Sequence, residues 1–158
     1  MTILKENNLK LDWLLGVIGI KNNWLSKETF FLDLEDLKGE EDFYTQLYLK
    51  DNLTNEELIE MILEKFQFSI SQLQLGERVW QLLFLKNIKE SDLNLNQKLN
   101  EIASLWPAFN YTKDWENFIN YMPLKNESGI GEENLYNNFL DFYNKNNSEV
   151  RKLGYTIS

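Results

Sequence analysis

The chain has 158 residues, 43% of them hydrophobic and 14% aromatic, with a formal net charge of −9, which is the composition of a folded acidic domain and not of a disordered segment. It contains no histidine and no cysteine, which excludes disulfides, zinc sites built on those residues, cysteine-ligated iron–sulfur clusters and catalytic machinery of the Ser-His-Asp or Cys-His kind. The length predicts a single domain covering residues 1–158.

The first third of the chain predicts three helices. Apolar residues spaced three and four apart predict an amphipathic helix over about 8–20. Ser26 is a predicted N-cap of a second helix, which Gly39 would end. A third helix is predicted over 41–50.

The middle of the chain contains a capping signal, an ambiguous stretch and a buried helix. Thr54 and Glu57 have the spacing of a capping box. Residues 66–71 alternate apolar and polar side chains, so they form either a short extended segment or part of a helix. Residues 77–85 are apolar nearly all round, which predicts a central buried helix.

The last third predicts three more helices. One covers about 95–106 and is stopped by Pro107, and a second repeats the apolar pattern over 115–122. A loop at 129–131 precedes a last long helix around 135–143. The fold expected is therefore all-α, with seven or eight short helices packed as helical hairpins.

Four of the five tryptophans lie on apolar helix faces, which predicts that they pack in the core and do not bind a ligand. They are Trp13, Trp80, Trp106 and Trp115.

The negative charge is concentrated between Ser26 and Glu64. This segment has only three lysines against twelve acids, so its surplus equals the net charge of the whole chain. The acids are Glu28, Asp33, Glu35, Asp36, Glu40, Glu41, Asp42, Asp51, Glu56, Glu57, Glu60 and Glu64. They form either a solvated surface or a surface that steers a basic partner.

In the second interpretation, eight acids lead the contact with a partner, and an exposed tyrosine anchors it. The predicted acids are Glu35, Asp36, Glu40, Glu41, Asp42, Glu56, Glu57 and Glu60, and the predicted anchors are Tyr44 and Tyr48.

Paired carboxylates also raise the hypothesis of an enzyme, because they perform acid–base glycoside chemistry or hold Mg²⁺. The candidate groups are Asp33, Glu35 and Asp36, or Glu57, Glu60 and Glu64. Such spacings occur on most surface helices, so we expect no catalytic residue, no metal site and no cofactor. The glycines at 129–131 lack the lysine and hydroxyl residue of a phosphate-binding loop.

The expected location is the cytoplasm, without membrane contact. The start of the chain lacks the apolar core of a signal peptide, and the most apolar windows are far shorter than the ~20 residues of a membrane span. Nucleic acid is not an expected ligand, because the chain is acidic and has only two arginines.

Residues 106–123, with the sequence WPAFNYTKDWENFINYMP, resemble a bacterial family known as domain of unknown function 2247. The aromatic residues after the first proline and the closing Tyr-Met-Pro carry the resemblance. Trp13 with Gly16, and Trp24 at the start of the second helix, extend it over about 9–145.

The resemblance implies a helical protein whose relatives lie among the immunity proteins of bacterial toxin systems, with no catalytic residues to transfer. An immunity protein binds its cognate toxin and covers the toxin's active site. We therefore expect a protein that neutralises a toxin with a basic surface. The alternatives are a structural or adaptor protein of phage or mobile-element origin, and a carboxylate enzyme. The sequence leaves the oligomeric state open.

Overall fold

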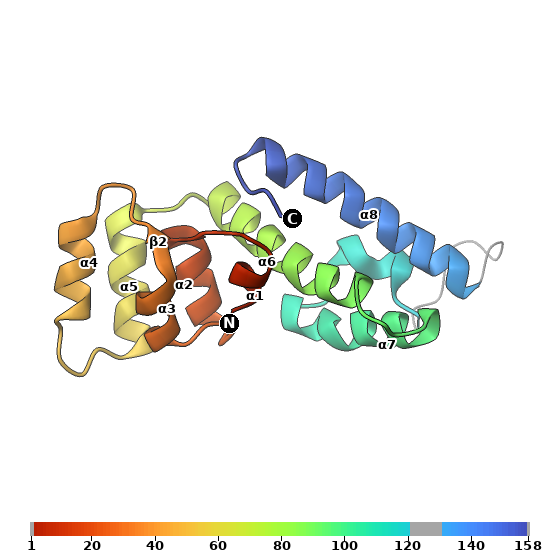
Figure 1. The fold of residues 1–158 in the computed structure, drawn as a ribbon, viewed down its shortest axis with the longest axis horizontal. Coiled ribbons are helices and arrows are strands. Elements are labelled where there is room, and N and C mark those ends of the chain that lie inside the picture. Colours follow the sequence, from red (N-terminus) through yellow and green to blue (C-terminus); the bar gives the residue numbers. More distant parts are fainter. Residues whose placement is uncertain (1, 121–130, 158) are drawn as a thin grey trace. The chain divides into compact units, whose positions relative to one another are not determined.

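The computed structural model describes residues 2–120 and 131–157, and within them the chain is all-α apart from one small sheet (Figure 1). The described part contains eight α-helices and two 3₁₀ helices, in agreement with the expected fold class. The chain divides into two compact units, Met1–Trp80 with Ile157–Ser158, and Gln81–Thr156. The prediction that 1–158 is a single domain stays a prediction.

The first unit is built from six α-helices and two short strands. They are α1 (Ile3–Glu6), β1 (Leu11–Asp12), α2 (Trp13–Lys21), α3 (Lys27–Asp33), β2 (Leu34–Asp36), α4 (Glu41–Tyr48), α5 (Asn55–Phe66) and the first half of α6 (Ile70–Lys89).

Helix α2 is the centre of this unit; it confirms a helix within the predicted range 8–20, but the amphipathic character predicted for it is wrong. Every residue from Trp13 to Ile20 is buried, because α2 is covered by neighbouring elements on all sides. The Trp13 ring lies 5.3 Å from the ring of Phe43 and 5.1 Å from that of Phe66. The helix begins only at Trp13, where the Asp12 carboxylate accepts a hydrogen bond of 2.8 Å from the Leu15 amide.

The second predicted helix begins as expected and ends early. Ser26 Oγ accepts from the Thr29 amide at 3.1 Å, which confirms the N-cap. The helix stops at Asp33 and not at Gly39, because Leu34–Asp36 leave it to form β2, which pairs in parallel with β1. Tertiary pairing overrides the helical spacing here.

The predicted capping box is half formed. Thr54 Oγ1 accepts from the Glu57 amide at 3.1 Å, but the described contacts of Glu57 include no return bond to Thr54. A complete box forms at α7, where Asn94 and Gln97 exchange bonds. The ambiguous stretch resolves into a connector of three residues, 67–69, between α5 and α6.

The second unit contains the rest of α6, then α7 (Leu95–Leu105), the 3₁₀ helices η1 (Trp106–Phe109) and η2 (Lys113–Phe118), and α8 (Glu132–Lys152). The buried helix at 77–85 and the helices at 95–106 and 135–143 are confirmed.

The α-helix predicted over 115–122 is wrong: it is a 3₁₀ turn that ends at Phe118, where aromatic rings pack side by side. The rings of Phe109, Phe118 and Phe142 all lie within 6.4 Å of the Trp115 ring. The end of that predicted helix, with Met122 and Pro123, and most of the predicted 129–131 loop lie outside the described residues. All four tryptophans predicted for the core are buried.

Candidate protein-docking surface

The predicted acidic residues lie on three neighbouring elements of the first unit. Glu35 and Asp36 are exposed on β2. Glu40 precedes α4, whose first turn holds Glu41 and Asp42. The remaining three lie in the first half of α5 and are exposed; they are Glu56, Glu57 and Glu60.

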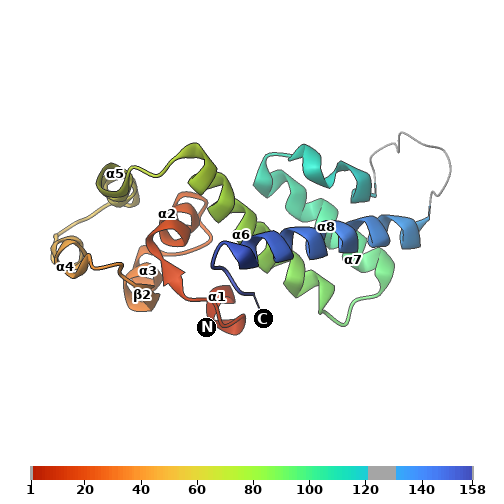
Figure 2. The same cartoon turned by 90° about the horizontal axis from the view of Figure 1, so that it is seen from above.

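Helices α4 and α5 run antiparallel, and this separates the acids into two groups (Figures 1 and 2). Two ion pairs between the helices show that α4 and α5 are antiparallel. The start of α4 meets the end of α5 where Glu40 Oε2 lies 3.4 Å from Lys65 Nζ, and the other ends meet where Glu57 Oε2 lies 4.0 Å from Lys50 Nζ. Glu40–Asp42 therefore lie at one end of the hairpin, and Glu56 and Glu57 lie at the other.

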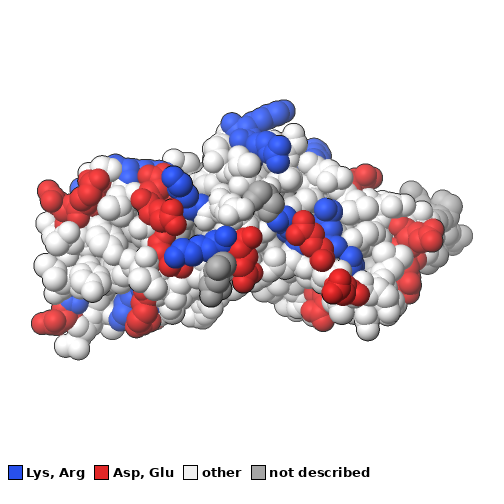
Figure 3. All heavy atoms as spheres, in the orientation of Figure 1, with Lys and Arg blue, Asp and Glu red and all other residues white. Residues whose placement is uncertain are grey.

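The distance between the two acidic groups is longer than the screening length of their charges. Eight residues of α4 span about 12 Å at 1.5 Å per residue. The screening length in physiological salt is about 8 Å. Each group therefore presents its own field to a partner. Over the first unit, on the face shown in Figure 3, acidic side chains likewise stand in more than one group, with uncharged residues between them.

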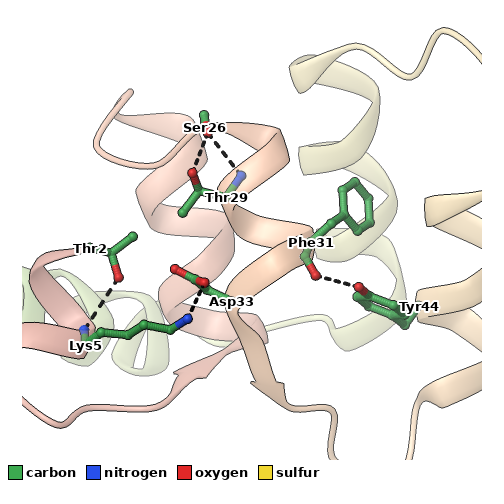
Figure 4. Close-up of polar contacts among 7 residues, drawn as sticks. All are labelled: Thr2, Lys5, Ser26, Thr29, Phe31, Asp33 and Tyr44. Carbon is green, nitrogen blue, oxygen red and sulfur yellow. Dashed lines mark hydrogen bonds and ion pairs between the residues drawn. The ribbon is translucent and has the colours of Figure 1, made fainter.

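Among the described residues, three of the twelve acids in the Ser26–Glu64 segment have a basic partner. Besides Glu40 and Glu57, the buried Asp33 accepts a hydrogen bond of 2.6 Å from Lys5 Nζ (Figure 4). Within the described residues no ion pair joins any of the other nine to a lysine or arginine. Most of the negative charge is therefore left to the solvent or to a partner.

The two predicted anchors, Tyr44 and Tyr48, come together with Phe31 in one aromatic cluster between α3 and α4. The tyrosine rings are stacked, with centroids 6.2 Å apart and an interplanar angle of 7°. Phe31 meets each of them edge-on at 5.7 Å. The cluster forms one wall of a hollow of about 850 Å³, which is in the size range of ligand pockets.

Tyr44 holds the cluster in place. Its hydroxyl donates a hydrogen bond of 2.5 Å to the Phe31 carbonyl oxygen, which ties α4 to α3 (Figure 4). Burial raises the pKa of the Tyr44 hydroxyl, and the neighbouring Tyr48 adds to the shift. Tyr48 has no such tie among the described contacts, and 63% of its surface is exposed.

The predicted set omits Phe31 and Leu32, although both line the hollow and Leu32 is 82% exposed. The sequence contains a pattern that could have indicated both residues. Phe30, Phe31 and Leu32 are consecutive on one short helix, and three consecutive helical residues span about 200° of its circumference. Phe30 takes the core position, Phe31 is half-buried and Leu32 faces outward.

Two lysines also line the hollow, and both heads have partners within the protein. Lys27 Nζ donates a hydrogen bond to the Leu53 carbonyl oxygen. Lys50 Nζ faces α5, 4.0 Å from the Glu57 carboxylate and 3.8 Å from Met61 Sδ. Their aliphatic stems are left as part of the wall.

Within the described residues, the hollow does not contain a pair of carboxylates. Glu28 is the single acid among the residues that line the hollow, so a second carboxylate for acid–base work is missing there. Across the described ranges 2–120 and 131–157, no three acids come together as a group that could hold a metal ion.

One family matches the chain: residues 1–147 match a family described as an uncharacterized protein conserved in bacteria (DUF2247). No curated protein and no solved structure matches. Among the helices of the described residues, none combines the length and apolar character needed to cross a bilayer.

Proposed function

We propose that this chain, which belongs to the bacterial DUF2247 family, functions by binding another protein. The proposed partner is a toxin with a basic surface, and the chain neutralises this toxin in the cytoplasm. The observation that carries the proposal is the set of nine acids between Ser26 and Glu64 with no ion pair to a base among the described residues. Charge of this sign repels nucleic acid and attracts a basic protein.

The acids and the aromatic hollow have different tasks in this proposal. Exposed charges speed the encounter and add little affinity, because salt and water screen them. Affinity comes from buried aromatic anchors at the centre of an interface. The cluster of Phe31, Tyr44 and Tyr48 supplies such an anchor, and it lies on α3 and α4 beside the acids.

The test uses the polypeptide encoded next to this gene in the source genome as the candidate toxin. Co-expression with this chain should restore growth to cells that the toxin arrests. Purified, the two should associate with a rate that falls as salt rises, because the encounter is steered by charge.

Three charge-neutralised variants locate the steering surface. Glu41→Gln with Asp42→Asn removes two charges at the start of α4, and Glu56→Gln with Glu60→Gln removes two from the first half of α5. Asp141→Asn with Glu149→Gln removes two exposed charges from the second unit and is the matched control. The first or second variant should slow association and flatten its salt dependence, and the control should not.

Equal association rates for all three variants would mean that the acidic groups are only solvated. A stable self-association of the chain, with no binding to the toxin, would favour the structural or adaptor role.

A further inference from the structure

We infer that the hollow between α3 and α4 receives an arginine side chain of the partner. The inference rests on the proposed function, because it names the group by which the basic partner is anchored. It follows from the walls of the hollow, from the placement of its charges and from the sign of the charge around it.

The aromatic wall suits a flat cation. Tyr48 is stacked on Tyr44, and 63% of the residue is exposed, so part of its ring face is accessible. A guanidinium group lies flat on such a face, attracted by the negative charge of the ring's π-system. Exposed Leu32 offers apolar contact to the methylene groups of the same arginine.

Glu28 is the one carboxylate among the described residues that line the hollow. The heads of Lys27 and Lys50 are bonded to Leu53 and paired with Glu57, as described above. Glu28 is exposed, lines the hollow and has no ion pair among the described residues. In this inference the Glu28 carboxylate, on the α3 side of the hollow, is the acceptor for the guanidinium N–H groups.

The negative charge around the hollow favours an arginine of the partner over an acidic or an apolar segment. The first unit carries fifteen Asp and Glu residues against eight Lys and Arg residues. An acidic segment of a partner would be repelled during its approach, and a purely apolar one would leave Glu28 without a counter-charge.

The experiment needs no toxin. The full chain, labelled with ¹⁵N, is titrated with the peptide Ac-Gly-Arg-Gly-NH₂ and with two matched peptides that carry citrulline or norleucine in place of arginine. Citrulline has nearly the shape of arginine without its charge. We expect saturable shifts of the amides of Phe31, Tyr44 and Tyr48 with the arginine peptide, and markedly weaker binding of the other two.

Variants make the assignment specific. Tyr48→Leu should weaken binding of the arginine peptide about two- to fivefold, the loss expected for an exposed cation–π contact. Glu28→Gln should weaken it by a similar factor. Tyr111→Leu removes a comparably exposed tyrosine from the second unit and should change nothing.

Three results would overturn the inference, each in a distinct way. Equal binding of the norleucine peptide would make the hollow an apolar groove. Shifts that depend on protein concentration without peptide would mean that a second copy of this chain fills it. If the Tyr48→Leu variant binds the arginine peptide as tightly as the unchanged protein, the peptide binds outside the hollow. If the arginine peptide binds and the toxin does not, only the proposed function fails.

Discussion

The indole Nε1 of Trp80 donates a buried hydrogen bond of 3.0 Å to the carbonyl oxygen of Leu15, 65 positions earlier in the chain. The bond joins α6 to α2, the central helix of the first unit. Both residues are fully buried, so the bond is formed without competition from water. It fixes α2 along its axis, and α2 in turn supports α3, which carries one wall of the hollow.

Trp80→Phe should destabilise the protein by about 1–3 kcal/mol, because the indole donor and part of the buried ring are both lost. The measurement is the free energy of unfolding in urea. A change below about 0.5 kcal/mol would mean that the core closes around the smaller ring.

Gly19→Ala tests the close approach of α2 to the same tryptophan. A Cβ at this position would lie 2.7 Å from Trp80 Cζ2 and 3.0 Å from Leu25 Cβ. Overpacking costs about 1–3 kcal/mol, and the gain in helix propensity offsets about 1. We expect a net loss of up to about 2 kcal/mol by urea unfolding. Gln46→Ala, on the exposed side of α4, is the control and should stay within about 0.5 kcal/mol; an equal effect of both variants would contradict the packing argument.

Lys5→Met tests the buried end of an ion pair. Lys5 and Lys50 are similarly exposed, at 42% and 47%, but the Asp33 side chain that faces Lys5 is only 7% exposed whereas Glu57 is 48% exposed. Loss of Lys5 leaves a buried carboxylate without its counter-charge and should cost about 1–3 kcal/mol. Lys50→Met, the matched control, should cost less than about 1 kcal/mol in the same unfolding assay. Similar losses for the two would show that the burial of Asp33 is unimportant.

Tyr143 should titrate later than an ordinary tyrosine. Burial, with a smaller contribution from the charge of Glu90, raises the pKa of its hydroxyl to about 12. The unfolded chain releases this proton near pH 10 and the folded chain near pH 12. The stabilisation is therefore fully present below pH 10 and is lost as the pH rises toward 12.

The check is absorbance at the tyrosinate band together with urea unfolding between pH 9 and pH 12. Tyr143→Phe should remove the latest titration step and reduce the fall in stability over that window. If Tyr143 titrates in the same pH range as the other tyrosines, its hydroxyl is open to water.

The sequence by itself determined the fold class, most helix positions and the core tryptophans, because helical periodicity and capping are local properties of the chain. Ser26 and Thr54 cap their helices wherever those helices pack. The sequence also located the surplus acids and both tyrosines of the aromatic cluster, since charge and aromatic content can be counted.

Only the tertiary structure decided what depends on distant partners. Helix α2 is buried on every side because α3, α5 and α6 enclose it, and spacing within 8–20 contains no information about them. Leu34–Asp36 become a strand because β1 lies beside them. Most of all, the antiparallel course of α4 and α5 places Glu41 and Glu56 at opposite ends of a hairpin. Sequence proximity suggested one acidic face, and the direction of the second helix divides it in two.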